Sequence, residues 1–169
     1  MEPLAHRLRP TKLSDVIGQE YLTGKDGIIT KMIENNHLQS FVLYGGPGTG
    51  KTTIGKIIKE MYSLESYEFN ASSDSKAILQ EITNLTKFYP NVILIIDEIH
   101  RMKKDTQDYL LPYLEDGRIT IIGLTTSNPY ISINKAIRSR LNIYQMNSIT
   151  EKDIVNLLKR TIKSLKIFK

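Results

Sequence analysis

The stretch FVLYGGPGTGKTTIGKIIKEM, residues 41–61, decides the fold of this chain. It begins with four apolar or aromatic residues, continues through a glycine-rich loop of the form G-x-x-x-x-G-K-[ST], and ends in isoleucines at helical spacing. Glycines let backbone N–H groups converge on phosphate oxygens without Cβ clashes, and the following helix adds the partial positive charge of its amino terminus. The strand, loop and helix together predict a phosphate-binding loop (P-loop) at the edge of an α/β sheet.

The residues of this loop have predicted roles in binding a nucleotide. Lys51 is expected to reach the β- and γ-phosphates, and the Thr52 hydroxyl to coordinate Mg²⁺. Backbone N–H groups of the other residues are expected to surround the phosphates. The loop therefore predicts ATP or ADP with Mg²⁺ as its ligand. The predicted binding residues are Gly45, Gly46, Pro47, Gly48, Thr49, Gly50, Lys51, Thr52 and Thr53.

Short apolar runs alternate with helical patterns along the chain. This alternation predicts crossover connections and a three-layer α/β domain with a five-stranded parallel sheet. Nearly continuous runs of valine and isoleucine are typical of strands that are buried on both faces. The predicted strands are residues 41–44, 66–69, 92–96, 119–124 and 143–146.

Apolar residues at spacings of three and four indicate the helices between these strands. Pro112 lies inside one pattern and is expected to kink or shorten that helix. A last helix is expected to begin near Thr150, which has near capping-box spacing to Asp153. The expected buried residues are Ile54, Ile57, Ile58 and Met61; Ile78, Leu79, Ile82 and Leu85; Leu110 and Leu114; and Ile154, Leu157, Leu158, Thr161 and Leu165.

The run NVILIIDEIHRMKK, residues 91–104, ends a predicted strand in two adjacent carboxylates. The letters DEIH match the DExH signature of helicase motors, and they equally fit a strand end in another nucleotide-driven machine. Asp97 follows Lys51 by 46 residues, and both are expected at the carboxyl edge of the sheet, where ligands bind in α/β folds. Asp97 is therefore predicted to hold Mg²⁺, and Glu98 to polarise the water that attacks the γ-phosphate. The basic letters HRMKK predict either a surface that faces DNA or a neighbouring subunit, or a solvated loop.

Two further segments carry polar residues near strand ends. ITIIGLTTSNP, residues 119–129, ends in Asn128, which either contacts the attacking water or the γ-phosphate, or is a turn residue before Pro129. AIRSRLNIY, residues 136–144, places Arg138 and Arg140 before the last strand. These are either surface arginines, or one of them stabilises transition-state charge in a neighbouring subunit.

Composition limits the class of protein. The chain has 169 residues, enough for one full-sized core, and it has no cysteine, which excludes disulfides and thiolate metal sites and favours a reducing cytoplasm. Apolar runs of about five residues are far short of the ~20 that span a bilayer. The net charge of +5 permits a polyanionic partner such as nucleic acid, although the basic face of the last helix is interpreted as solvated.

Three segments carry a resemblance to a known family. Residues 3–24 (PLAHRLRPTKLSDVIGQEYLTG), 97–129 and 133–140 (INKAIRSR), together with the P-loop, resemble AAA+ ATPases, and more narrowly the replication-associated recombination protein A family. That family is also called maintenance of genome stability protein A and includes the Werner-helicase-interacting ATPase. The resemblance runs from residue 3 to about residue 159. A single P-loop fold that carries Asn128 and Ser139-Arg140 together differs from a DExH helicase, so His100 is interpreted as incidental to that signature.

The resemblance implies roles that spacing leaves open. Asn128 resembles the sensor 1 residue, Arg140 resembles the arginine finger that acts on a neighbouring subunit, and Arg138 is then structural or on the surface. Asn70 is similar to a clamp-loader residue that holds the catalytic glutamate inactive until DNA binds, and the alternative is a plain turn. The residues that resemble the adenine-packing segment are Arg9, Pro10, Val16, Ile17 and Gly18.

The resemblance also implies an architecture and a function. It implies the strand order 5-1-4-3-2, a nucleotide-binding domain over residues 1–147, and the first helix of a truncated lid over residues 148–169. The implied function is an ATPase module of a homo-oligomeric, DNA-associated motor in replication-fork maintenance and recombination, cytoplasmic or nucleoid-associated, with single-stranded DNA-binding protein as a further candidate partner. Alternatives are a clamp-loader-like or branch-migration-motor subunit, or a nucleotide-dependent scaffold with little hydrolysis.

The sequence departs from the family pattern at two residues, and the chain is expected to lack most of the lid. Gly46 stands where proline is common, which should be tolerated, and Ser127 lacks the carboxylate that is usual at its position. With only the first lid helix, and without the neighbour that supplies Arg140, the chain alone is expected to bind nucleotide weakly and hydrolyse it very slowly.

Overall fold

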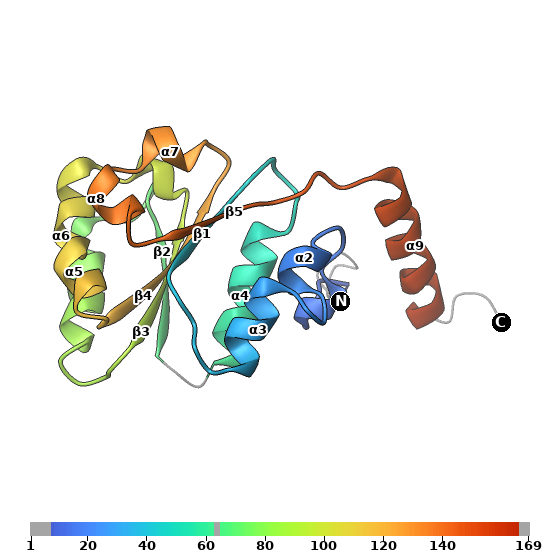
Figure 1. The fold of residues 1–169 in the computed structure, drawn as a ribbon, viewed down its shortest axis with the longest axis horizontal. Coiled ribbons are helices and arrows are strands. Elements are labelled where there is room, and N and C mark those ends of the chain that lie inside the picture. Colours follow the sequence, from blue (N-terminus) through green and yellow to red (C-terminus); the bar gives the residue numbers. More distant parts are fainter. Residues whose placement is uncertain (1–7, 63–64, 166–169) are drawn as a thin grey trace.

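The computed structural model describes residues 8–62 and 65–165, which form five parallel strands and the helices that cover them (Figure 1). The strand order is β2-β3-β4-β1-β5, so the predicted order 5-1-4-3-2 is confirmed. Each predicted strand is present, with its ends shifted by at most one residue. The strands are β1 (Phe41–Tyr44), β2 (Ser66–Asn70), β3 (Val92–Asp97), β4 (Ile119–Thr125) and β5 (Asn142–Gln145).

Helices follow the strands as crossover connections, with short helical turns at the loops. None of the helices in the described part of the chain combines the length and apolar character that crossing a membrane requires. The helical segments are η1 (Leu13–Asp15), α2 (Glu20–Thr23), α3 (Ile28–Glu34), α4 (Lys51–Met61), α5 (Lys76–Leu85), η2 (Ile99–Arg101), α6 (Lys104–Glu115), α7 (Pro129–Ser132), α8 (Lys135–Arg138) and α9 (Glu151–Leu165).

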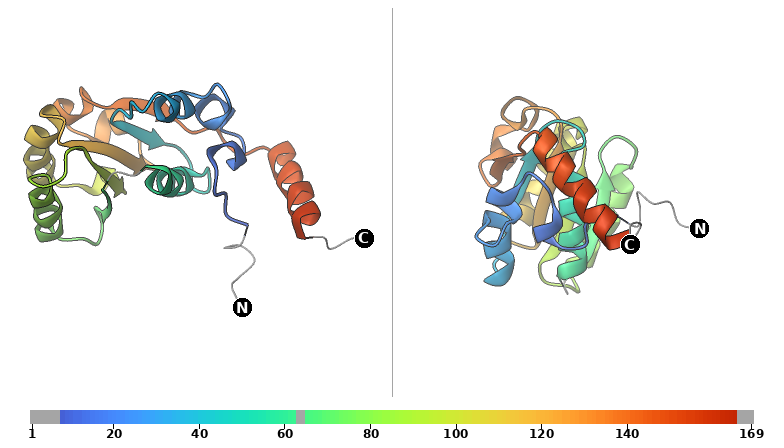
Figure 2. Two further views of the ribbon diagram at one scale, coloured as in Figure 1. Left: turned by 90° about the horizontal axis from the view of Figure 1, so that it is seen from below. Right: turned by 90° about the vertical axis from the view of Figure 1, so that its right-hand side faces the viewer.

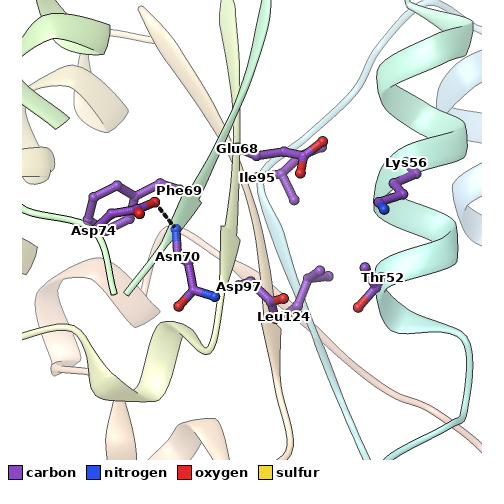
Figure 3. Close-up of a pocket in the computed structure, with 9 residues that line it drawn as sticks. All are labelled: Thr52, Lys56, Glu68, Phe69, Asn70, Asp74, Ile95, Asp97 and Leu124. Carbon is purple, nitrogen blue, oxygen red and sulfur yellow. Dashed lines mark hydrogen bonds between the residues drawn. The ribbon is translucent and has the colours of Figure 1, made fainter. Parts of the chain in front are cut away.

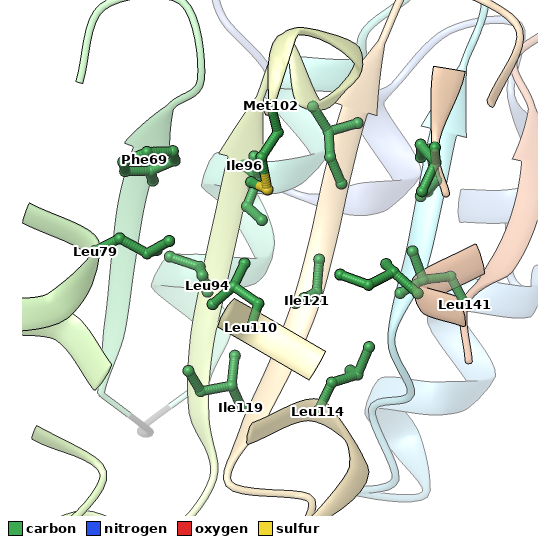
Figure 4. Close-up of a cluster of buried hydrophobic side chains, with 14 of the residues drawn as sticks. Phe69, Leu79, Leu94, Ile96, Met102, Leu110, Leu114, Ile119, Ile121 and Leu141 are labelled. Atoms are coloured by element: carbon green, nitrogen blue, oxygen red, sulfur yellow. The ribbon is translucent and has the colours of Figure 1, made fainter. Parts of the chain in front are cut away.

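The sheet separates two apolar clusters, one on each face. Along β3, Leu94 and Ile96 belong to one cluster, while Ile93 and Ile95 belong to the other, as the two-residue period of a strand requires. The first cluster packs beneath α5, α6 and α8 (Figure 4), and the second beneath α2, α3 and α4. Burial on both faces explains the unbroken Val/Ile run, since each such side chain contributes about 1.5–3 kcal/mol.

Three predictions about the covering helices are corrected. Met61 is 52% exposed, because α4 ends there and the side chain borders a surface groove beside α3. Ile78 is also exposed, because α5 turns Leu79 and Ile82 toward the sheet instead. Pro112 does not shorten α6, which continues to Glu115, so of its two predicted effects only the kink stays a prediction.

The last helix, α9, begins where it was predicted to begin, but its apolar face is not buried as predicted. The capping box is confirmed, because Thr150 N donates to Asp153 Oδ2 (2.9 Å) and Asp153 N donates to Thr150 Oγ1 (3.2 Å). The predicted buried stripe is wrong: α9 stands away from the sheet (Figures 1 and 2), and the short segment before and within η1 lies beside it. Leu157 and Thr161 are half-buried, and the side chain of Leu165 lies outside the described residues. The exposed apolar residues of α9 are Ile154, Val155, Leu158 and Ile162.

Candidate functional site

The P-loop joins β1 to the amino terminus of α4. Gly48 and Gly50 have φ values of +75° and +102°, which lie in the left-handed region that favours glycine. A Cβ on Gly50 would also lie 3.2 Å from Val16 Cγ1, so this glycine lets the loop approach the N-terminal segment closely. Gly50 immediately precedes Lys51, the first residue of α4. The loop therefore presents its backbone at a helix amino terminus, as anion binding requires.

Lys51 lies against its own loop. Its Nζ donates to the carbonyl oxygens of Gly45 (2.8 Å) and Gly46 (2.7 Å). Partial burial lowers the pKa of Lys51, and the carboxylates of Glu98 and Asp97 oppose that shift. These opposing effects place Lys51 in the electrostatic field of the two predicted catalytic carboxylates.

Thr52 and Asp97, the two predicted metal ligands, line one pocket between α4 and the carboxyl ends of β2 and β3 (Figure 3). Magnesium sites in nucleotide enzymes use one or two protein oxygen ligands and complete the shell with phosphates and water. A threonine hydroxyl and an aspartate beside a phosphate cradle fit that donor set.

Glu98 has an unusual backbone conformation. Its φ of 53° and ψ of 39° lie in the left-handed region, which costs a non-glycine residue on the order of 1 kcal/mol. The turn is held by Glu98 N, which donates to Asp97 Oδ1 (2.9 Å), and by Arg101 N, which donates to Glu98 O (2.8 Å). This turn directs the chain out of β3 into η2 immediately beyond Asp97. Strained residues of this kind are concentrated at functional sites.

Sequence reasoning missed two residues beside Glu98. His100 Nε2 lies 3.3 Å from Glu98 Oε2, and His100 Nδ1 is hydrogen-bonded to the Thr125 hydroxyl (2.8 Å). Thr125 is the last residue of β4 and is 1% exposed. The sequence favours an incidental His100, because a single P-loop fold that carries Asn128 and Ser139-Arg140 differs from a DExH helicase. One sequence feature could have indicated Thr125: like Asp97, it is the last residue of a parallel strand, so both residues lie at the carboxyl edge of the sheet.

Asn70 and Asp97 are opposite each other in the register of β2 and β3, and both line the pocket of Figure 3. The Asn70 side-chain oxygen accepts from Ser72 N (2.8 Å), and its backbone N–H donates to Asp74 Oδ2 (2.7 Å). The side chain thus forms a local turn in this conformation. Its predicted contact with Glu98 stays a prediction.

Asn128 lies in the loop after β4. Its side-chain oxygen accepts from Tyr130 N (2.9 Å) and caps α7. This is the arrangement that the turn interpretation describes, and the sensor role stays a prediction. Ser127 N donates to Thr125 Oγ1 (3.0 Å), so the loop that carries Asn128 is tied to the tip of β4.

The predicted adenine-packing residues divide between two neighbouring pockets. Pro10, Val16 and Ile17 line a pocket with P-loop residues and with α9, whereas Arg9 lines the adjacent pocket beside Arg160. Gly18 has a φ of +72°, and a Cβ there would lie 3.1 Å from Ile149 Cδ1, in the linker just before α9. The N-terminal segment therefore faces both the P-loop and α9.

Gln19 joins these parts and was not predicted as a site residue. It is fully buried, and its Nε2 donates to Thr49 O (3.2 Å) and to Asn147 O (2.9 Å). Its Oε1 accepts from Asn147 N (2.9 Å). One amide thus fixes the P-loop backbone to the linker between β5 and α9. A glutamine in an otherwise ordinary segment carries no pattern that would reveal this role.

The two arginines before β5 have different partners. Arg138 donates to the carbonyl oxygens of Tyr130 and Ile133, so it stabilises the α7–α8 turn. Arg140 forms an ion pair with the exposed Glu115 of α6. Because β5 runs parallel to β1, Arg140 lies at the amino-terminal edge of the sheet, opposite the edge that carries the P-loop. Arg140 is therefore placed away from the phosphate cradle of its own chain.

Comparisons with known proteins show the family to which this chain is similar. The family model described as "Holliday junction DNA helicase RuvB P-loop domain" matches residues 8–156. Replication-associated recombination protein A of Bacillus subtilis (strain 168) is 46% identical over 162 residues, which cover 96% of this chain and 38% of that protein. ATPase WRNIP1 of Dictyostelium discoideum is 42% identical over 168 residues, covering 95% of this chain and 19% of that protein.

Solved structures show a similar fold. The Thermotoga maritima RuvB Holliday junction branch migration motor superposes with a TM-score of 0.77 at 27% identity, covering 95% of this chain and 55% of that chain. The chain spans less than two fifths of the length of replication-associated recombination protein A of Bacillus subtilis and of ATPase WRNIP1. The shared part contains the P-loop, both carboxylates, Asn128 and Arg140.

Proposed function

This chain belongs to the family of RuvB-type P-loop domains, and we propose that it is the ATP-binding and ATP-hydrolysing module of a DNA-associated AAA+ motor. The observation that carries the proposal is the shared pocket of Thr52 and Asp97, with Lys51 in the field of Asp97 and Glu98. A cradle for phosphates, oxygen ligands for Mg²⁺ and an additional carboxylate form the minimal set for hydrolysis of a phosphoanhydride.

In the proposed reaction, the P-loop backbone and Lys51 hold the phosphates of ATP. Thr52 and Asp97 would hold Mg²⁺, which would supply positive charge against the phosphates. Glu98 orients the attacking water and accepts its proton, and Asn128 contacts the water or the γ-phosphate. Pro10, Val16, Ile17 and Gly18 enclose the base, with Arg9 at the margin.

The proposal includes a neighbouring subunit. Arg140 lies at the opposite sheet edge from its own P-loop, so it is suited to act on the nucleotide of another copy in a homo-oligomer. Glu115 holds that arginine at the surface until the neighbour is present. An arginine supplied in this way contributes about 10³-fold or more to the rate.

The biological setting rests on the relatives. Their names connect them with replication, recombination and Holliday junction branch migration. We therefore place the proposed motor on DNA ends, forks or single-stranded regions, in the cytoplasm or nucleoid, with single-stranded DNA-binding protein as a candidate partner. Within the chain we assign residues 1–147 to the nucleotide-binding domain and residues 148–169 to the first lid helix. A branch-migration subunit is the second candidate, favoured by the family model and the RuvB superposition.

The decisive experiment measures ATP hydrolysis by the full-length gene product with and without single-stranded DNA and DNA ends. We expect Mg²⁺-dependent turnover that DNA stimulates, and we expect Glu98→Gln to bind ATP without turning it over. Unchanged turnover in Glu98→Gln would refute the assigned role of Glu98. ATP binding without any turnover in the unmodified protein would favour the scaffold alternative. Stimulation by four-way junctions alone would favour the branch-migration subunit.

A further inference from the structure

Glu98 and the tip of β4 are connected through a chain of side chains. Ser127 N donates to Thr125 Oγ1 (3.0 Å), the Thr125 hydroxyl is hydrogen-bonded to His100 Nδ1 (2.8 Å), and His100 Nε2 lies 3.3 Å from Glu98 Oε2. The series begins in the loop of Asn128 and ends at the predicted water-activating carboxylate. It therefore crosses from β4 to β3 at the sheet edge that carries the P-loop.

The environment of this series favours a fixed geometry. Thr125 is 1% exposed, and the His100 side chain is 16% exposed, so solvent competes weakly for their polar atoms. Ser127 N can only donate a hydrogen bond. The Thr125 oxygen accepts it, and its own proton can go to His100 Nδ1 (2.8 Å) or to Ser127 O (3.4 Å), of which the shorter contact favours His100 Nδ1. With Nδ1 as acceptor, the neutral imidazole carries its proton on Nε2, the atom that faces the Glu98 carboxylate.

We infer that His100 and Thr125 form a positioning pair that sets the orientation of the Glu98 carboxylate and links it to the loop that carries Asn128. The inference rests on the proposed role of Glu98 in hydrolysis. Any displacement of the Asn128 loop by a bound γ-phosphate would pass through Ser127 and Thr125 to His100. His100 thus occupies, in this conformation, the place beside Glu98 that sequence reasoning assigned to Asn70.

The test compares steady-state ATP hydrolysis in variants of the full-length gene product, in the presence of stimulating DNA. We expect His100→Ala to lower kcat about 10- to 100-fold, because a small misplacement of a catalytic group costs about that much. KM for ATP should stay within about 2-fold, because the P-loop contacts are intact. Thr125→Val should lower kcat in the same direction, while Thr125→Ser keeps the hydroxyl and should restore it.

A variant that carries both substitutions shows whether His100 and Thr125 act through one another or independently. His100→Ala with Thr125→Val should be no slower than His100→Ala alone, because the second change breaks a series that is already broken. Arg101→Ala is the matched control, and it is compared with His100→Ala without DNA, because one interpretation of the HRMKK segment places Arg101 on a DNA-facing surface. Its Nε lies 3.9 Å from Glu98 Oε2, but the side chain is 63% exposed, and exposed pairs contribute little.

Three results would overturn the inference: a kcat for His100→Ala within about 2-fold of the unmodified protein, losses that multiply in the double variant, or an equal loss in Arg101→Ala. ATP affinity, measured with a fluorescent nucleotide on the same preparations, identifies any variant that has failed to fold, and Thr125→Ser then carries the test. If Glu98→Gln hydrolyses ATP normally, the proposed role of Glu98 fails, and the inference that rests on it fails too. If Glu98→Gln is inactive while His100→Ala is fully active, the positioning pair alone fails.

Discussion

Helices α4 and α9 have similar amphipathic patterns and opposite environments. In α4, Ile54, Ile57 and Ile58 are at most 1% exposed and pack against the sheet. In α9, the apolar side chains of Ile154 and Leu158 are 47% and 54% exposed. A helical period of apolar residues therefore predicts that one face will avoid water, but it does not predict what covers that face.

The difference between these helices matters for the site. Burial of α4 fixes its amino terminus beneath the P-loop, so the donors that face the phosphates are held by the core. Helix α9 lies beside the N-terminal segment, where Leu157 lines one pocket with Val16 and Ile17. Its contacts include an ion pair between Arg160 and Asp15, and Gln19 holds the linker before it. The core thus supports α4 on one whole face, whereas α9 meets the N-terminal segment at the surface.

The largest expected effect is at the start of α4. Lys51→Ala should lower ATP affinity about 30-fold or more, because removal of a partly buried charge from a charge-assisted contact costs about 2–5 kcal/mol. Isothermal titration with ATP and Mg²⁺ measures the loss. Lys59→Ala on the same helix is the control, since its ion pair with Glu68 is solvent-exposed and its removal should leave the affinity unchanged. Normal ATP affinity in Lys51→Ala would contradict the assignment of the loop.

The second prediction tests the two helices directly by matched truncations. Ile57→Ala should lower the free energy of unfolding by about 2–5 kcal/mol, because it leaves a cavity against the sheet. Ile154→Ala should change it by less than about 0.5 kcal/mol, because that side chain is half in water already. Urea unfolding of both variants provides the comparison. A loss above about 2 kcal/mol in Ile154→Ala would mean that the face of α9 is covered in solution.

The sheet was predictable because β3 is buried on both faces, which leaves the continuous apolar run of residues 92–96, and because the other strands are short apolar runs that alternate with helical patterns. Their order was taken from a family resemblance, and the comparisons with replication-associated recombination protein A and WRNIP1 confirm that resemblance. Helix α9 was predicted with its cap but with the wrong environment. Its pattern is local, whereas burial depends on what other segments lie nearby.

In the candidate site, too, a local sequence pattern does not reveal contacts with distant segments. The P-loop and Asp97 could be proposed from the sequence because their chemistry requires particular residue types at a strand end, and the structure brings Thr52 and Asp97 to one pocket. His100, Thr125 and Gln19 were missed because each acts through a contact with a residue far away in the chain, such as the pairing of His100 with Thr125 across two strands. Asn128 was predicted from its place after a strand as well as from resemblance, and Asn70 from resemblance; both side chains make local turns in this structure, and their catalytic roles stay predictions.

The third prediction concerns the start of α9. Thr150→Ala removes a cap that contributes about 1 kcal/mol, and α9 has little packing to compensate for the loss. We expect amide exchange to become about 5-fold faster in the first turns of α9, with no change in α4. Hydrogen exchange by mass spectrometry measures both helices in one sample. Equal acceleration in the two helices would show that α9 unfolds only together with the core.

The smallest expected effect is the pH dependence of the same cap. Hydrogen bonds from the Thr150 hydroxyl and the Thr150 backbone N–H lower the pKa of Asp153 from its ordinary 3.8. Because the folded-state pKa is depressed, the cap stabilises α9 above about pH 4, and this contribution is lost as the pH falls through the folded value. NMR Cα shifts of α9 should move toward coil values in that range, while those of α4 stay constant. Asp153→Asn should remove the dependence, since it cannot ionise. If the pH dependence of the α9 shifts persists in Asp153→Asn, it belongs to another group. The charge of Asp153 would then play no part in the stability difference between α9 and α4.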